Sequence, residues 1–248
     1  MRAKVQAIKM IVIGASKGGG SALKTLLSAL PRDFPLPVAI VQHRGPETGS
    51  LLRDMLQAGC LQPVVEVEDK ELILGGRVYL APASYHLLVD NGCFSLSTEA
   101  PVSYARPSVD VLFESAADAC GAGLMAVVLT GANQDGAAGT VAVKRRGGLV
   151  VVQEPSTAEH PTMPRAAIAA WGHVSGDTIR NSTNSGHVPD RSCPLQILPL
   201  EEIGPFIVRE AKKSADDHFH TTPVLPEVLA GHPEEAGMTQ EEKHTHKK

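Results

Sequence analysis

The chain has 248 residues and a formal net charge of −4 at pH 7, which is long enough for one α/β domain with a large core and gives no reason to expect nucleic acid as a partner. Its four cysteines are scattered without a C-x-x-C pair, which argues against a zinc ribbon, a redox motif or a disulfide scaffold and is typical of a reducing cytosol. No stretch is long and apolar enough to cross a membrane, so we expect a cytoplasmic protein without membrane insertion. We also expect no metal and no cofactor.

The first predicted unit is a strand, a tight turn and a helix. The apolar run at residues 10–13 is typical of a strand covered on both faces in a parallel sheet. After a glycine-rich turn, leucines recur at helical spacing until Pro31 ends the pattern. Ser16 stands at the break between strand and helix, and the function depends on its role.

Three interpretations of Ser16 are open from the local sequence. Residues 14–18 fit G-x-S-x-G, in which a strained turn exposes a nucleophilic serine above a sheet. A glycine-rich turn before a helix can also hold a phosphate, although the match to G-x-G-x-x-G is poor. Finally, Ser16 can simply cap the helix.

The next segments predict a second parallel strand and then a different texture. Residues 37–43 form an apolar run that ends in His43, and a helix over residues 51–56 follows a Gly/Pro loop. Between residues 63 and 98 we expect short antiparallel strands at 64–67, 77–80 and 86–89, because Asn91-Gly92 is a strong hairpin signal.

The second half returns to alternating strands and helices. Ser108 is placed to cap a helix that ends near Cys120, and a buried strand at 124–130 leads into a glycine-rich loop with Asp135. A strand at 149–152 and a short helix at 164–170 follow. This order predicts an α/β fold of Rossmann-like type, with a doubly wound, mostly parallel sheet and an antiparallel β-hairpin excursion.

In such a fold the carboxyl ends of the strands meet at one edge, where ligands bind. Ser16, His43 and Asp135 each follow a different apolar run there. Together they suit nucleophilic catalysis, with Ser16 attacking, His43 as base and then acid, and Asp135 orienting His43. The backbone N–H of Lys17 is a natural oxyanion donor. Taken singly, His43 could be a strand-end histidine and Asp135 a cap for the helix after Gly136.

Six consecutive segments resemble the signatures of the CheB protein-glutamate methylesterase family, in order and with suitable spacing from residue 10 to 170. They are IGASKGG, AIVQH, VYLAP with a following His86, RPSVDVLFESAA, VVLTGANQDGAAG and MPRAAI. The resemblance implies a serine esterase that releases methanol from glutamate methyl esters on chemoreceptors and deamidates receptor glutamines. By motif position Ser16 corresponds to the nucleophile, His43 to the base and Asp135 to the acid, and the N–H of Ala132 to a second oxyanion donor.

The chain departs from the family pattern beside these positions. Lys17 stands where threonine is common, Arg44 where an apolar residue is common, and Ala132-Asn133 replace a Met-Gly pair, which is expected to alter the turn and turnover. We expect Lys17, Arg44 and Arg106 to ring the mouth of the site and attract a glutamate-rich receptor, with Arg44 and Arg106 binding substrate. The alternative is that Lys17 and Arg44 point to solvent and Arg106 pairs with a carboxylate such as Asp110.

The expected domain organisation is one methylesterase-type catalytic domain at residues 1–211, with a surface insertion at 175–192 and a disordered tail at 212–248. The pattern begins near Met1, so we expect a stand-alone form without a receiver domain and with a separate regulator. Tail histidines at 218, 220, 244 and 246 are expected to be uncoordinated. Outside the esterase hypothesis, two alternatives stay open: a regulatory or binding module of the same fold with little or no activity, or a phosphate- or nucleotide-binding protein.

Overall fold

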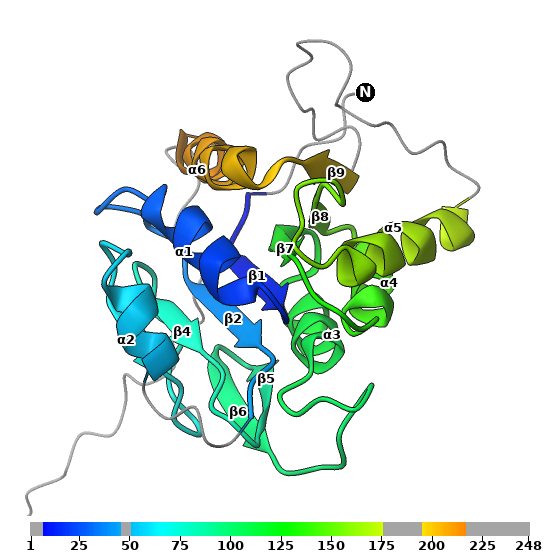
Figure 1. The fold of residues 1–248 in the computed structure, drawn as a ribbon. Helices are drawn as coiled ribbons and strands as arrows, with labels where there is room; N and C mark the ends of the chain where they lie inside the picture. Colours follow the sequence, from blue (N-terminus) through cyan, green and yellow to red (C-terminus); the bar gives the residue numbers. More distant parts are fainter. Residues whose placement is uncertain (1–6, 46–50, 176–194, 217–248) are drawn as a thin grey trace, which may run out of the picture.

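The computed structural model describes residues 7–45, 51–175 and 195–216. Its centre is a seven-stranded parallel sheet in the order β3-β4-β2-β1-β7-β8-β9 (Figure 1). The strands are β1 (Met10–Ala15), β2 (Val38–Gln42), β3 (Val64–Glu66), β4 (Val78–Leu80), β7 (Leu124–Val128), β8 (Leu149–Gln153) and β9 (Leu195–Leu198). The predicted doubly wound α/β class is confirmed.

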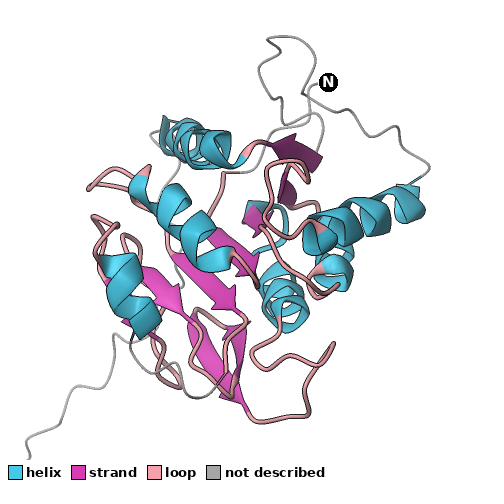
Figure 2. Cartoon of the chain, viewed as in Figure 1, coloured by secondary structure: helices cyan, strands magenta, loops and turns pink. Residues whose placement is uncertain are grey.

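Helices cover both faces of the sheet (Figure 2). One face carries α1 (Gly19–Ser28), α2 (Leu51–Gln57) and α6 (Leu200–Asp216), and the other carries α3 (Val109–Cys120), α4 (Ala137–Arg145) and α5 (Thr162–Ser175). The β1 side chains alternate between the two cores: Ile11 and Ile13 pack with α1 and α6, whereas Val12 packs with α3. Both faces are therefore apolar, which explains the continuous apolar run at residues 10–13.

The segment from 63 to 98 corrects part of the sequence prediction. The hairpin at Asn91-Gly92 is confirmed, because β5 (His86–Asp90) and β6 (Cys93–Ser97) pair antiparallel with both turn residues at positive φ. However, β3 and β4 are parallel strands of the main sheet. The chain between them, residues 67–77, is long enough to return to the starting end of the sheet, so two short neighbouring strands need not form a hairpin.

The position of β1 between β2 and β7 brings three loops together. These loops leave the carboxyl ends of the three adjacent strands and carry Ser16, His43 and Asp135. The first turn of α3 also reaches this edge, because Gly14 has no side chain: a Cβ there would lie 2.3 Å from Val109 Cγ1. Gly14 thus allows a helix N-terminus to approach the central strand.

The carboxyl-terminal boundary also differs from expectation. We predicted disorder from residue 212, but α6 continues to Asp216. Its last turns are anchored, because buried Ser214 accepts a hydrogen bond from the N–H of Ile8 at 2.9 Å and Ala211 lies in the core. The rest of the predicted tail, with the histidines at 218, 220, 244 and 246, and residues 176–192 of the predicted insertion lie outside the described residues.

Candidate active site

Ser16 lies in the turn between β1 and α1, and its main chain is fixed on both sides. Its N–H donates to the carbonyl of Thr130 at 3.0 Å, and its carbonyl accepts from Gly19 N at 2.9 Å and Gln42 Nε2 at 2.7 Å. Its side chain is only half-buried, and within the described part of the chain its hydroxyl makes no hydrogen bond. The N-cap of α1 is Gly18, not Ser16, so the interpretation of Ser16 as a helix cap is wrong.

His43 directly follows β2 and lies beside the end of β1, with its N–H bonded to the carbonyl of Ala15 at 3.0 Å. Both ring nitrogens have partners. Nε2 lies 2.7 Å from Oδ2 of Asp135, and Nδ1 lies 3.2 Å from Nδ2 of Asn133. The structure therefore brings the predicted base and the predicted acid into direct contact.

Asp135 is fully enclosed and accepts four hydrogen bonds. Besides His43, the donors are Val109 N at 2.7 Å, Asp110 N at 3.0 Å and the Ser108 hydroxyl at 2.8 Å. Burial opposes ionisation, but the hydrogen bond from His43 and the two backbone N–H groups outweigh it and hold the pKa of Asp135 below its usual value. The carboxylate is therefore ionised at neutral pH and occupies the positive end of α3.

A second buried carboxyl, Asp110, lies beside the first. It accepts hydrogen bonds from the N–H groups of Gly136 and Gly139 at 2.9 and 2.7 Å, at the start of α4. Asp135, in the loop before α4, thus binds the N-terminus of α3, and Asp110, on α3, binds the N-terminus of α4. We call this arrangement the reciprocal cap. Burial raises the pKa of Asp110 to about 7, against the Gly139 amide and with help from the charge of Asp135. The alternative that Asp135 caps the helix after Gly136 is wrong, since the first N–H groups of that helix donate to Asp110 instead.

The backbone around Ser16 offers donors for an anion. The N–H groups of Lys17 and Ala132 donate no hydrogen bond within the described residues. Thr130 lies in the same loop as Ala132 and joins it to the turn of Lys17, because its hydroxyl donates to the Lys17 carbonyl at 3.0 Å. The same hydroxyl accepts a hydrogen bond from His160 N at 2.8 Å. Gly131 packs so closely that a Cβ there would lie 2.9 Å from Ser16 Cβ.

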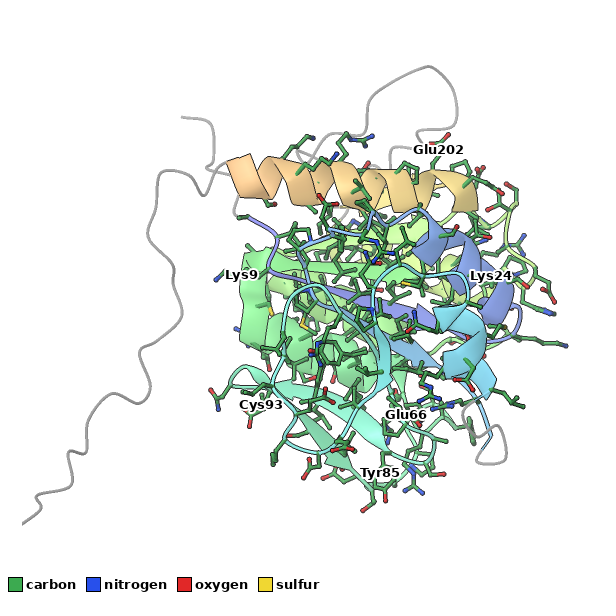
Figure 3. The ribbon with its side chains drawn as sticks, turned by 90° about the vertical axis from the view of Figure 1, so that its left-hand side faces the viewer. Lys9, Lys24, Glu66, Tyr85, Cys93 and Glu202 are labelled. Carbon is green, nitrogen blue, oxygen red and sulfur yellow. The ribbon has the colours of Figure 1, made fainter. Side chains whose placement is uncertain are left out.

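The three cationic residues have different surroundings, and their proposed role in binding substrate stays a prediction. Arg44 has a side chain that is only 4% exposed, and its guanidinium donates to Glu66 and to the Ala81 carbonyl. The side chain of Glu66 is labelled in Figure 3. Arg106 donates to the carbonyls of Thr98 and Glu99 rather than to Asp110, so the proposed Arg106–Asp110 pair is wrong. Lys17 is exposed beside Ser16.

Several residues that shape the site were not singled out from the sequence. Gln42 joins the carbonyls of Ser16 and His43 through one amide, and its position just before His43 at the strand end was the available signal. Ser108 was expected only as a helix cap, but it also donates to Asp135. For the contact between Asn133 and His43 the sequence offered only the unusual Ala132-Asn133 pair.

The fold and these side chains define a doubly wound α/β protein with a hydroxyl, an imidazole and a buried carboxylate at one sheet edge, the groups that serine hydrolases use. A model of the CheB methylesterase family matches residues 11–177, and the chain belongs to this family. It is similar to the crystal structure of the Thermotoga maritima CheB methylesterase catalytic domain, with a TM-score of 0.69 and 30% identity over 82% of this chain and 98% of that one.

Curated relatives agree with this assignment. A protein of Leptospira interrogans serovar copenhageni named putative protein-glutamate methylesterase/protein-glutamine glutaminase is 48% identical over 64% of this chain and 83% of its own length. Protein-glutamate methylesterase/protein-glutamine glutaminase 3 of Burkholderia lata is 42% identical over 66% of this chain, which spans only 46% of that protein. In the described part of this chain, no helix is long and apolar enough to span a membrane.

Proposed function

We propose that the protein is a serine esterase that hydrolyses glutamate methyl esters of chemoreceptors to glutamate and methanol. The contact between His43 and the ionised Asp135, at the same sheet edge as the unbonded hydroxyl of Ser16, is the observation that carries the proposal. The names of the relatives supply the substrate class. A receptor glutamine has a carbonyl in the same place, so deamidation is a second reaction for the same groups.

The proposed chemistry uses the same groups in both half-reactions. Asp135 accepts the Nε2 proton of His43, which leaves Nδ1 as the base. Ser16 Oγ attacks the ester carbonyl as His43 takes its proton, and the N–H groups of Lys17 and Ala132 stabilise the oxyanion. His43 then gives the proton to the departing methoxide, which leaves as methanol. Water repeats these steps on the acyl-enzyme, releasing the glutamate carboxyl and restoring Ser16.

The backbone geometry supports this assignment of roles. Ser16 is held by its main chain alone, so its hydroxyl is free to change partners during a reaction. Asp135, in contrast, is bound on both oxygens and cannot rotate away from His43. A mobile nucleophile and a fixed orienting carboxylate are what acyl transfer through an imidazole requires.

Methanol release from a methylated chemoreceptor fragment tests the proposal. Ser16→Ala and His43→Ala should abolish release, whereas Asp118→Asn, an exposed aspartate on α3, should leave it unchanged. A fluorophosphonate that labels Ser16 separates an active esterase from a phosphate-binding or regulatory protein of the same fold, because only an activated serine reacts. Failure to release methanol and to label, with folded protein and methylated receptor, would refute the esterase.

A further inference from the structure

Asn133 contacts both partners of the histidine–aspartate pair, a contact that glycine could not make at this position. Its Nδ2 lies 3.2 Å from His43 Nδ1, and its Oδ1 lies 3.3 Å from the backbone N of Asp135. Asn133 keeps a negative φ, so the loop does not need the conformational freedom of glycine here. The φ of the turn therefore does not depend on which of the two residues stands at this position.

The orientation of the Asn133 amide follows from its second contact. A backbone N–H can only donate, so the atom facing Asp135 N must be the amide oxygen. The NH₂ group then faces His43 Nδ1 and donates to it. Donation requires a lone pair on Nδ1, which is the neutral tautomer with its proton on Nε2 toward Asp135.

The same lone pair is the one that a reaction at Ser16 needs. Asp135 occupies Nε2, so Nδ1 is the only ring nitrogen left to receive the Ser16 proton. Once Nδ1 is protonated, its N–H would face the NH₂ of Asn133 and the hydrogen bond would be lost. The amide thus stabilises the neutral imidazole and offers nothing to the imidazolium that forms during proton transfer.

We propose that Asn133 is a positioning residue that holds His43 in the neutral form and restrains its action as a base. This inference rests on the proposed function, because it assigns a role within the same site. One neutral hydrogen bond present only before proton transfer is expected to slow the reaction about 3- to 10-fold. Asn133→Gly should accordingly react faster than the natural chain. A substitution that only loosened the loop would instead slow the reaction.

The test uses the full chain and the rate of fluorophosphonate labelling at Ser16. Asn133→Gly should raise the second-order rate constant about 3- to 10-fold. The nearly isosteric Asn133→Asp should lower it, because a carboxylate facing Nδ1 favours the protonated ring, which cannot act as a base. Gln134→Ala is the matched control, since that neighbour is exposed and its side chain makes no hydrogen bond within the described residues.

A nuclear magnetic resonance measurement on ¹⁵N-histidine-labelled protein provides an independent readout. The His43 Nδ1 signal, assigned by its loss in His43→Ala, should move toward the position of an unbonded lone pair in Asn133→Gly and stay in Gln134→Ala. Equal or slower labelling of Asn133→Gly, or an unmoved Nδ1 signal, overturns the inference. If the natural chain neither labels nor releases methanol, the proposed esterase fails, while the Nδ1 signal still decides whether Asn133 binds His43.

Discussion

Replacing Asp135 by asparagine should destabilise the fold as well as abolish activity. If the amide nitrogen takes the place of Oδ1, the Ser108 hydroxyl can rotate to accept, but the N–H of Asp110 loses its partner. If it takes the place of Oδ2, His43 can change tautomer, but the N–H of Val109 loses its partner. Either orientation leaves one buried helix N–H unpaired, which costs about 1–3 kcal/mol.

Loss of the negative charge at the positive end of α3 adds about 0.3–1 kcal/mol, so the expected total is about 1–4 kcal/mol. Urea unfolding at pH 7 measures it, with Asp118→Asn as the exposed control on the same helix, which should change stability by less than about 1 kcal/mol. Because the pKa of Asp135 is lowered in the folded state, the difference from the natural chain should vanish as the pH falls through that pKa. A loss below about 0.5 kcal/mol at pH 7 would refute the four-bond account.

Two further substitutions probe the reciprocal cap and its approach to the sheet. The pKa of Asp110 is raised to about 7, so between about pH 4 and pH 7 the folded chain holds a proton that the unfolded chain releases. The natural chain should therefore lose up to about 4 kcal/mol of stability as the pH rises through this range. Asp110→Asn should show no such loss when unfolding curves of the two proteins are compared across the range. Gly14→Ala should lower the stability by about 1–3 kcal/mol in the same assay, because its Cβ meets Val109. Adding Val109→Ala should recover part of that loss. Equal stability of Gly14→Ala and of the double variant would contradict this close approach.

Much of the architecture followed from apolar runs and turn residues. Buried parallel strands are continuous apolar runs, so β1, β2, β7 and β8 were found directly from the sequence. The edge strands were harder, because Val64–Glu66 is short and only partly buried, and nothing in three residues distinguishes a parallel from an antiparallel partner. Burial of the end of α6 also escaped prediction, since it depends on a contact with Ile8 at the other end of the chain.

The site was predictable to the level of residue type and sheet edge. The rule that strand ends converge is enough to place Ser16, His43 and Asp135 at one sheet edge from the sequence alone. It could not show how each side chain is held: the bonds from α3 to Asp135 join residues far apart in the sequence. Arg44 shows the same limit, because its contact with Glu66 depends on a strand whose pairing in the sheet was not predicted correctly.

The unequal anchoring of Ser16 and Asp135 bears on how other proteins of this fold should be judged. Asp135 ties α3 to the loop before α4, so a descendant that had lost catalysis would still need an acceptor there to keep its helices in place. The hydroxyl of Ser16 supports nothing else in the described structure, and alanine there would leave the turn intact. Retention of the aspartate is therefore weak evidence of activity in a relative, whereas a serine at the turn after β1 is strong evidence.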